Sequence, residues 1–126
     1  MKRIILLILT LVFGNCDNTK QVLAERNNPT DFLSCSGKPW NNESDYIEGT
    51  LTNSASKTDY GNIVMIVEFY NEKGGKIGTE RIVEFEILKH GETRTYKHSI
   101  HPPNLVDNLR VVIDRAQFID TVETEG

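Results

Sequence analysis

Apolar and polar residues alternate with a period of two along much of this chain, which is typical of strands with one buried face. Five runs follow the pattern, and the residues expected on one face of each are Ile47, Gly49 and Leu51; Ile63, Met65, Val67 and Phe69; Val83, Phe85 and Ile87; Tyr96, His98 and Ile100; and Leu109, Val111 and Ile113. Val64 and Ile66 are apolar as well, so we expect the second run to be a central strand, partly covered on both faces.

Turn-forming residues separate these runs at short intervals. The turn signals are Asn53-Ser54, Lys73-Gly74-Gly75, His90-Gly91 and Pro102-Pro103, and the glycine pair predicts a hairpin. No segment shows a convincing helical stripe. Because each short strand can bury one face well, two sheets must pack together. The pattern therefore predicts an all-β domain built as an antiparallel β-sandwich.

The first sixteen residues have a different pattern. Lys2 and Arg3 precede an apolar run at residues 4–13, and Gly14-Asn15-Cys16 follow. The run is about half of the roughly 20 residues that a membrane-spanning helix needs. Its length and its basic flank are typical of a secretory signal peptide.

This signal resembles that of bacterial lipoproteins, in which a cysteine receives diacylglycerol and becomes the mature N-terminus. On this interpretation residues 1–15 are the signal peptide and Cys16 is the lipidation site, and two or three acyl chains would make a stable anchor. The alternative is cleavage after Gly14. That cleavage would release a soluble exported protein and would permit a disulfide between Cys16 and Cys35.

The rest of the chain divides into three parts. Residues 17–31 are polar, contain Pro29 and lack periodicity, so residues 16–31 are expected to form a flexible tether that starts at the lipidated Cys16. The β-sandwich is expected to span residues 32–121. Residues 122–126 are expected to form a short tail.

The charge balance narrows the choice of partners. The chain carries 14 Lys and Arg against 18 Asp and Glu, and loss of Lys2 and Arg3 with the signal peptide leaves 12 basic residues and a net charge of about −6. Nucleic-acid binding depends on basic residues that neutralise phosphates, and direct adhesion to anionic lipid depends on them too. We therefore expect no nucleic-acid partner, and membrane contact through the lipid on Cys16.

Residue types that often carry catalysis or bind metals occur here without a recognisable pattern. His98 and His101 are expected to point to opposite faces of a strand, with His90 at the surface of a turn, His98 half-buried and His101 in a loop. Glu84 and Glu86 are expected on a solvated outer sheet face, although glycosidases also use two carboxylates. We predict that the protein is not an enzyme and has no metal site and no small-molecule cofactor.

Cys35 is expected to be a small buried residue, because no neighbouring base would activate its thiol. Trp40 and Tyr46 are candidate binding residues. They flank the polar stretch Asn41-Asn42-Glu43-Ser44, and an exposed Trp in such surroundings suits contact with a sugar or a partner protein. The alternative for Trp40 is that it covers the open end of the core.

Several segments resemble the FxLYD-type domains, small immunoglobulin-like modules of bacterial and archaeal envelope proteins. The first strand of those domains is similar to residues 47–53 (IEGTLTN), and their naming motif is similar to Val67-Glu68-Phe69-Tyr70-Asn71. The turns that follow are similar to Gly74-Gly75-Lys76-Ile77-Gly78 and His90-Gly91-Glu92. The resemblance covers roughly residues 46–114 and implies an immunoglobulin-like sandwich outside the cytoplasm, without catalytic residues.

Together these features predict an exported, lipid-anchored, non-enzymatic module of the bacterial cell envelope that binds another, unidentified envelope protein. The alternative is a soluble or anchored module that binds a small ligand or carbohydrate around Trp40.

Overall fold

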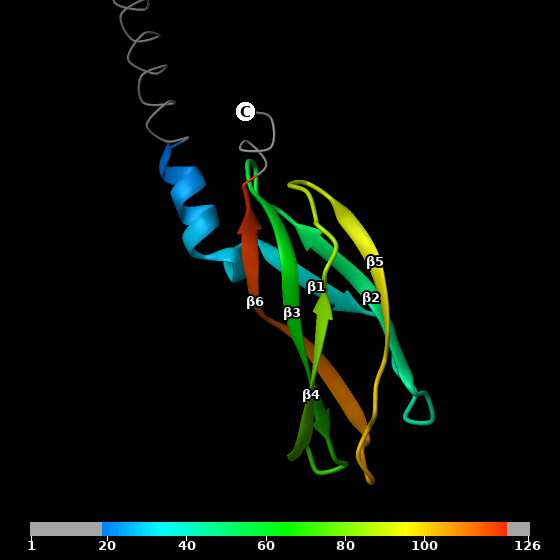
Figure 1. Ribbon diagram of the computed structural model, residues 1–126. Helices are drawn as coiled ribbons and strands as arrows, with labels where there is room; N and C mark the ends of the chain where they lie inside the picture. The colour runs from blue at the N-terminus through cyan, green and yellow to red at the C-terminus, as the bar shows by residue number, and fades with distance from the viewer. Residues whose placement is uncertain (1–18, 121–126) are drawn as a thin grey trace, which may run out of the picture.

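Two antiparallel sheets of three strands each make up the computed structural model, which describes residues 19–120 (Figure 1). One sheet has the order β1-β2-β5, with β1 at Leu33–Gly37, β2 at Tyr46–Asn53 and β5 at Thr93–Ser99. The other has the order β4-β3-β6, with β4 at Lys76–Glu84, β3 at Asp59–Tyr70 and β6 at Asn108–Ile119. The prediction of an all-β sandwich is confirmed, and the strand order matches strands A-B-E and C′-C-F of an immunoglobulin-like sandwich.

The centre of the core lies on β3, as the doubly apolar pattern of this strand predicted. Ile63, Met65, Val67 and Phe69 face the first sheet and are almost completely buried. Hydrogen-bonded strands flank β3 on both sides. Since β3 has the longest run of apolar residues, its central position buries more apolar surface than an edge position would.

A glycine on β2 leaves space for groups of both neighbouring strands of its sheet. Gly49 pairs with Tyr96 of β5 and with Gly37 of β1, and a Cβ atom at residue 49 would collide with the Tyr96 ring and with the Ser36 carbonyl oxygen. The alternation of Ile47, Gly49 and Leu51 therefore has a packing reason, because the missing side chain leaves space for an aromatic ring.

The turn between β3 and β4 also follows the prediction. Gly74 has a φ of 82°, a conformation that glycine adopts without a steric penalty. Asn71 stabilises the turn, because its Oδ1 accepts hydrogen bonds from the Lys73 and Gly75 backbone N–H groups at 3.0 and 2.9 Å. The hairpin at the glycine pair is therefore confirmed.

The prediction for residues 83–87 is wrong about the buried face and about where the strand ends. β4 ends at Glu84, and Phe85 is 74% exposed. Ile82 lies opposite Met65 and is buried, so the even-numbered residues of β4 point inward and Val83 points outward. Glu84 therefore does not lie on the solvated outer face. It faces β5, where its carboxylate lies 2.9 Å from Nε2 of His98.

The prediction of a flexible tether is wrong for residues 19–31. Residues 19–27 form an α-helix, and η1 (Pro29–Asp31) is a short 3-10 helix that leads into β1. The α-helix ends before Pro29, since a proline there disfavours continuation. The helix lies against one end of the sandwich (Figure 1), where Glu25 is buried. Sequence periodicity missed this helix because polar residues, Glu25 and Arg26, supply much of its contact with the sandwich.

Candidate functional site

The structure brings the two predicted binding residues together. Trp40, in the loop between β1 and β2, and Tyr46, at the start of β2, both line a hollow of about 160 Å³. Lys38 and Glu48 line it too, and their side chains form an ion pair at 3.0 Å. The hollow thus combines two aromatic rings with charged groups and the amide of Asn41, a mixture of surfaces that can contact a polar ligand.

Tyr46 is positioned by its backbone and remains 41% exposed. The Ser44 hydroxyl donates to the Tyr46 carbonyl oxygen at 3.0 Å and accepts from the Tyr46 N–H at 3.3 Å. The Lys97 ammonium lies 4.4 Å from the centroid of the Tyr46 ring, within the range of a cation–π contact. One face of the ring is therefore occupied by a lysine of β5.

Trp40 is half-buried and packs against the core. Its indole Nε1 is buried and has no hydrogen-bond partner, which is unusual for a tryptophan. This packing agrees with the interpretation that Trp40 covers the open end of the core. Direct contact of Trp40 with a ligand stays a prediction.

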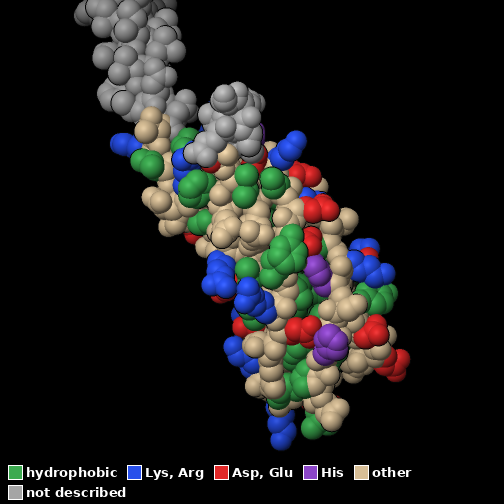
Figure 2. All heavy atoms as spheres, in the orientation of Figure 1, with side chains coloured by type: hydrophobic (Ala, Val, Ile, Leu, Met, Phe, Trp, Pro, Cys, Tyr) green, Lys and Arg blue, Asp and Glu red, His purple; other side chains and the backbone are tan. Residues whose placement is uncertain are grey.

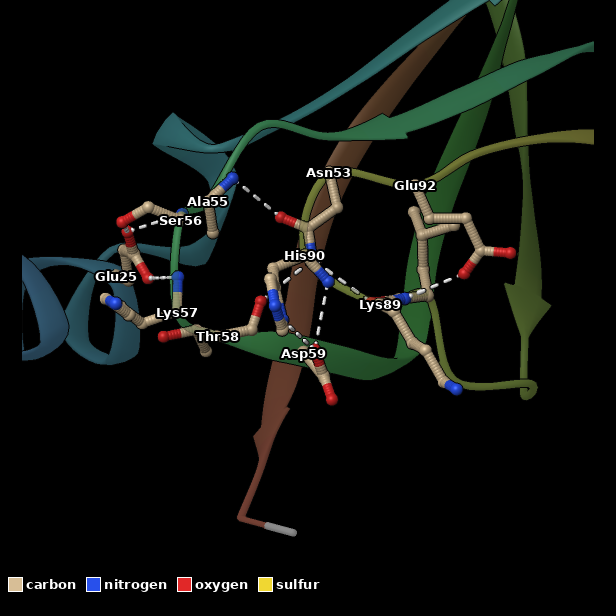
Figure 3. A network of polar contacts seen from close by, with 11 residues as sticks. Glu25, Asn53, Ala55, Ser56, Lys57, Thr58, Asp59, Lys89, His90 and Glu92 are labelled. Carbon is tan, nitrogen blue, oxygen red and sulfur yellow. Dashed lines mark hydrogen bonds and ion pairs between the residues drawn. The ribbon is translucent and has the colours of Figure 1, made fainter. Parts of the chain in front are cut away.

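A network of polar contacts joins the loops at the end of the sandwich where the helix lies (Figure 3). Its centre is Asn53, which is completely buried. The Asn53 Nδ2 group donates to the carbonyl oxygens of Thr58 and Leu88 at 2.9 and 3.1 Å, and its Oδ1 accepts from the Ala55 N–H at 2.9 Å. One amide side chain thus holds the β2–β3 loop against the β4–β5 loop.

Glu25 connects the helix to the same loops. Its carboxylate accepts hydrogen bonds from the Ser56 N–H and hydroxyl at 2.9 and 3.0 Å, from the Lys57 N–H at 3.1 Å and from Gln21 Nε2 at 2.7 Å. Burial by itself would raise the pKa of Glu25, but the bonds from Gln21 and Ser56 outweigh burial and lower it to about 2. The carboxylate is therefore ionised at neutral pH and acts as an anchor for the helix.

Tyr60 adds a second link between the helix and the sandwich. Its hydroxyl donates to the backbone carbonyl oxygen of Glu25 at 2.6 Å. Burial, together with the nearby charge of Glu25, raises the pKa of Tyr60 to about 12, so the phenol keeps the proton that it donates. Beside it, Asp59 Oδ1 accepts from the His90 N–H at 2.9 Å and lies 2.7 Å from His90 Nδ1 (Figure 3).

Each histidine lies where the sequence predicted and beside a carboxylate. His90 is exposed in its turn, His98 is half-buried on β5, and His101 is exposed in the following loop, 3.3 Å from Glu80. The three are spread over separate parts of the sandwich. Within residues 19–120, no group of three or more His, Cys, Asp or Glu side chains is arranged to hold a metal ion.

The structure describes one of the two cysteines. Cys35 lies half-buried on β1, where its thiol donates to the Val111 carbonyl oxygen of β6 at 3.4 Å. Burial raises the pKa of Cys35, so the thiol stays protonated and poorly nucleophilic, as expected for a residue that packs between the sheets. Cys16, the predicted lipidation site, lies outside the described residues.

The outward face of the β4-β3-β6 sheet is a further candidate surface that the sequence patterns did not single out. Its basic side chains belong to β4 and β6, and no sequence motif connects them. The pairing of both strands with β3 places them on one face. Strand register is therefore the signal that was needed to find this surface.

Comparison with known proteins identifies no relative: no family model, no curated protein and no solved structure matches the chain. Among the described residues, no helix is long and apolar enough to cross a membrane.

Proposed function

We propose that this protein is a non-enzymatic β-sandwich module of the bacterial cell envelope, held outside the cytoplasm by lipid on Cys16, and that it binds another envelope protein. The resemblance of the first sixteen residues to a lipoprotein signal supports the anchor. The segments similar to FxLYD-type domains support the setting and a membership in that group. Two of these segments fall on β2 and β3 of an immunoglobulin-like sandwich, which agrees with the resemblance.

The observation that carries the proposal is that the helix at residues 19–27 is fixed to the sandwich. Only residues 17 and 18 separate Cys16 from Thr19, the first described residue of the helix. Glu25 and Tyr60 fix that helix to one end of the sandwich. A lipid on Cys16 would therefore hold the helix end of the domain close to the membrane, without a long tether. The opposite end and the outward sheet faces would then point to other proteins.

The anchor is tested by the intact mass of the protein extracted from membranes with detergent. We expect a chain that starts at Cys16 and carries two or three acyl groups. Cys16→Ala should move the protein out of the membrane fraction, whereas Cys35→Ala, the matched control, should leave it there. A lipid-free chain that starts at Asn15 would contradict the anchor and favour a soluble exported protein.

Partner binding is tested in cells with photo-crosslinking side chains placed at exposed positions. Tyr46, Phe85 and Leu105 are suitable sites because each is at least 41% exposed. We expect a defined adduct with one envelope protein from at least one of the three positions. A chain that forms no adduct from any of them, and whose deletion changes no envelope property, would contradict the proposed interaction.

The hollow beside Tyr46 favours a second candidate function, the binding of a carbohydrate or another small polar ligand. Its aromatic rings and polar groups are the observation in its favour. Tyr46→Ala tests this better than Trp40→Ala, since Trp40 also packs against the core. We expect Tyr46→Ala to abolish binding in a glycan array while Tyr70→Ala, on another face, keeps it; an unchanged array would exclude this function.

A further inference from the structure

Three rows of side chains cross the outward face of the β4-β3-β6 sheet. The registers place Val83, Val64 and Arg115 in the first row, Arg81, Ile66 and Val112 in the second, and Thr79, Glu68 and Arg110 in the third. The first two rows therefore contain a floor of aliphatic side chains with one arginine at each of two opposite corners. The third row contains a cation and an anion.

The cations on this face fall into two groups. Arg110 and Lys76 are both paired with Glu68, at 3.0 and 3.2 Å. The hydrogen bond from the Tyr70 hydroxyl and the contacts with these two cations lower the pKa of Glu68. Arg81 and Arg115 are exposed and have no hydrogen-bond or ion-pair partner within residues 19–120. Half of the face neutralises its own charge, and the other half presents two uncompensated guanidinium groups.

The uncompensated half is hollowed. A groove of about 430 Å³ lies between Arg81 and Arg115, within the range of about 300–1,000 Å³ that is usual for ligand sites. Val64 and Val83 form its floor, and Phe85 lies at its side with 74% of its surface exposed. Figure 2 shows Lys and Arg side chains beside exposed hydrophobic ones on this face. The ligand that fits has an apolar part and negative charges.

Two amide side chains at one end of the groove narrow the choice. The Asn62 Nδ2 group donates to Gln117 Oε1 at 2.7 Å, and both residues line the groove. This pair leaves one amide oxygen and one amide N–H₂ group available, whichever way the two amides are oriented. A peptide bond needs one acceptor and one donor of this kind. These two amide side chains therefore favour a peptide over a lipid headgroup as the ligand of the groove.

We propose that this groove binds an acidic peptide segment of a partner protein, with an apolar side chain on the Val64–Val83 floor and carboxylates on either side at Arg81 and Arg115. The inference rests on the proposed function, because it assigns a site and a chemistry to the partner. From the strand spacing, the two arginine Cα atoms lie about 10 Å apart across the sheet and about 7 Å along it. The two Cα atoms are thus about 12 Å apart, a distance that carboxylates about four residues apart in an extended peptide span.

The net negative charge of the rest of the domain strengthens the preference of an acidic peptide for this groove. The mature chain has an excess of acidic residues, so an acidic peptide is repelled by most of its surface and attracted to this groove. Arginine also suits the contact because its planar fork donates two parallel hydrogen bonds to one carboxylate.

The test uses the detergent-solubilised full chain and a fluorescein-labelled peptide with two glutamates on each side of a phenylalanine, followed by fluorescence anisotropy. We expect saturable binding that weakens as salt rises, and about a tenfold weaker Kd for each of Arg81→Ala and Arg115→Ala. Arg110→Ala is the matched control on the same face. It should change Kd less than twofold, because Glu68 already occupies this arginine.

Phe85→Ala separates the apolar contribution from the charge. It should weaken binding of the phenylalanine peptide while leaving the weaker binding of an all-glutamate peptide unchanged. All variants are at exposed positions, and their thermal unfolding shows whether the fold is kept. Absence of saturable binding, or an equal loss of affinity in Arg110→Ala, would overturn the inference.

Crosslinking in cells distinguishes failure of this site from failure of the proposed function. An adduct from position 85 that disappears in Arg81→Ala/Arg115→Ala supports the groove. Adducts from position 46 or 105 alone would overturn the groove and leave the proposed function standing. No adduct from any position would overturn both.

Discussion

The two ends of this sandwich differ in how their loops are held. At the end that carries the helix, buried polar side chains connect loops that are distant in sequence, and Asn53 and Glu25 have their hydrogen-bonding groups paired. At the far end, which contains residues 38–45, 71–75 and 100–107, most polar contacts join residues close in sequence, as at Asn71. One end is thus held by contacts between distant segments, and the other mainly by contacts within each loop.

Leu105 illustrates the second kind of end. It is 88% exposed and has a φ of 70°, a left-handed conformation that costs a residue with a Cβ about 1 kcal/mol or more. It lines a hollow of about 420 Å³ between the β3–β4 and β5–β6 loops. Neither hydrophobic burial nor backbone preference accounts for a leucine at this position.

The largest expected effect tests the centre of the helix end. Asn53→Ala would leave the Thr58 carbonyl oxygen and the Ala55 N–H without a partner and would remove one of the two hydrogen bonds to the Leu88 carbonyl oxygen. We therefore expect the free energy of unfolding to fall by about 4 kcal/mol. Asn71→Ala, the matched change at the far end, removes two exposed hydrogen bonds and should cost about 1 kcal/mol. Urea denaturation measures both, and equal losses would refute the contrast between the ends.

Acid should weaken the helix end next. The folded pKa of Glu25 is about 2 against an ordinary value of 4.5, so the unfolded chain binds more protons between these values. Glu25 therefore contributes about 3 kcal/mol above pH 4.5, and this contribution is lost as pH falls from about 4.5 to about 2. The stability difference between the native chain and Glu25→Gln should shrink over that window, and Glu43→Gln, at an exposed position of the far end, is the control.

A smaller effect is expected for the tyrosines. Tyr60→Phe removes the hydrogen bond to the Glu25 carbonyl oxygen and should cost about 1.5 kcal/mol. Tyr46→Phe at the far end removes an exposed hydroxyl and should leave the free energy of unfolding unchanged. Hydrogen exchange of the helix amides should rise in Tyr60→Phe, and unchanged exchange would show that the helix is held without this bond.

The smallest effect is expected to be a gain in stability at the far end. Leu105→Asn should stabilise the fold by up to about 1 kcal/mol, because asparagine tolerates the left-handed conformation better than leucine. The control is Leu23→Asn, also at an exposed leucine but in helical conformation, where no gain is expected. If Leu105→Asn lowers the free energy of unfolding, the strain argument is wrong.

The strands were predictable where each buries one apolar face. The patterns at β2, β3, β5 and β6 agree with the structure, since alternation reports directly on the two faces of a strand. At β4 the pattern does not predict the start of the strand, and it predicts the wrong buried face at its end. Glu84 and His98 both face inward and contact each other. A polar residue at these positions therefore indicates a paired contact between the sheets and not exposure to solvent.

The candidate site residues were predictable in part. Trp40 and Tyr46 stand six positions apart, and sequence proximity already suggested that they share a surface. The groove of Arg81 and Arg115 depends on two strand registers. These residues are 34 positions apart in the sequence, so no local pattern connects them.

The sequence alone therefore determined the all-β class, the central strand and the turns, because periodicity and turn chemistry act over a few neighbouring residues. The tertiary structure decided the docking of the helix and the assembly of the groove. Buried polar contacts such as those of Glu25 become favourable only when both partners are already in place, and cross-strand neighbours exist only once the strands have paired.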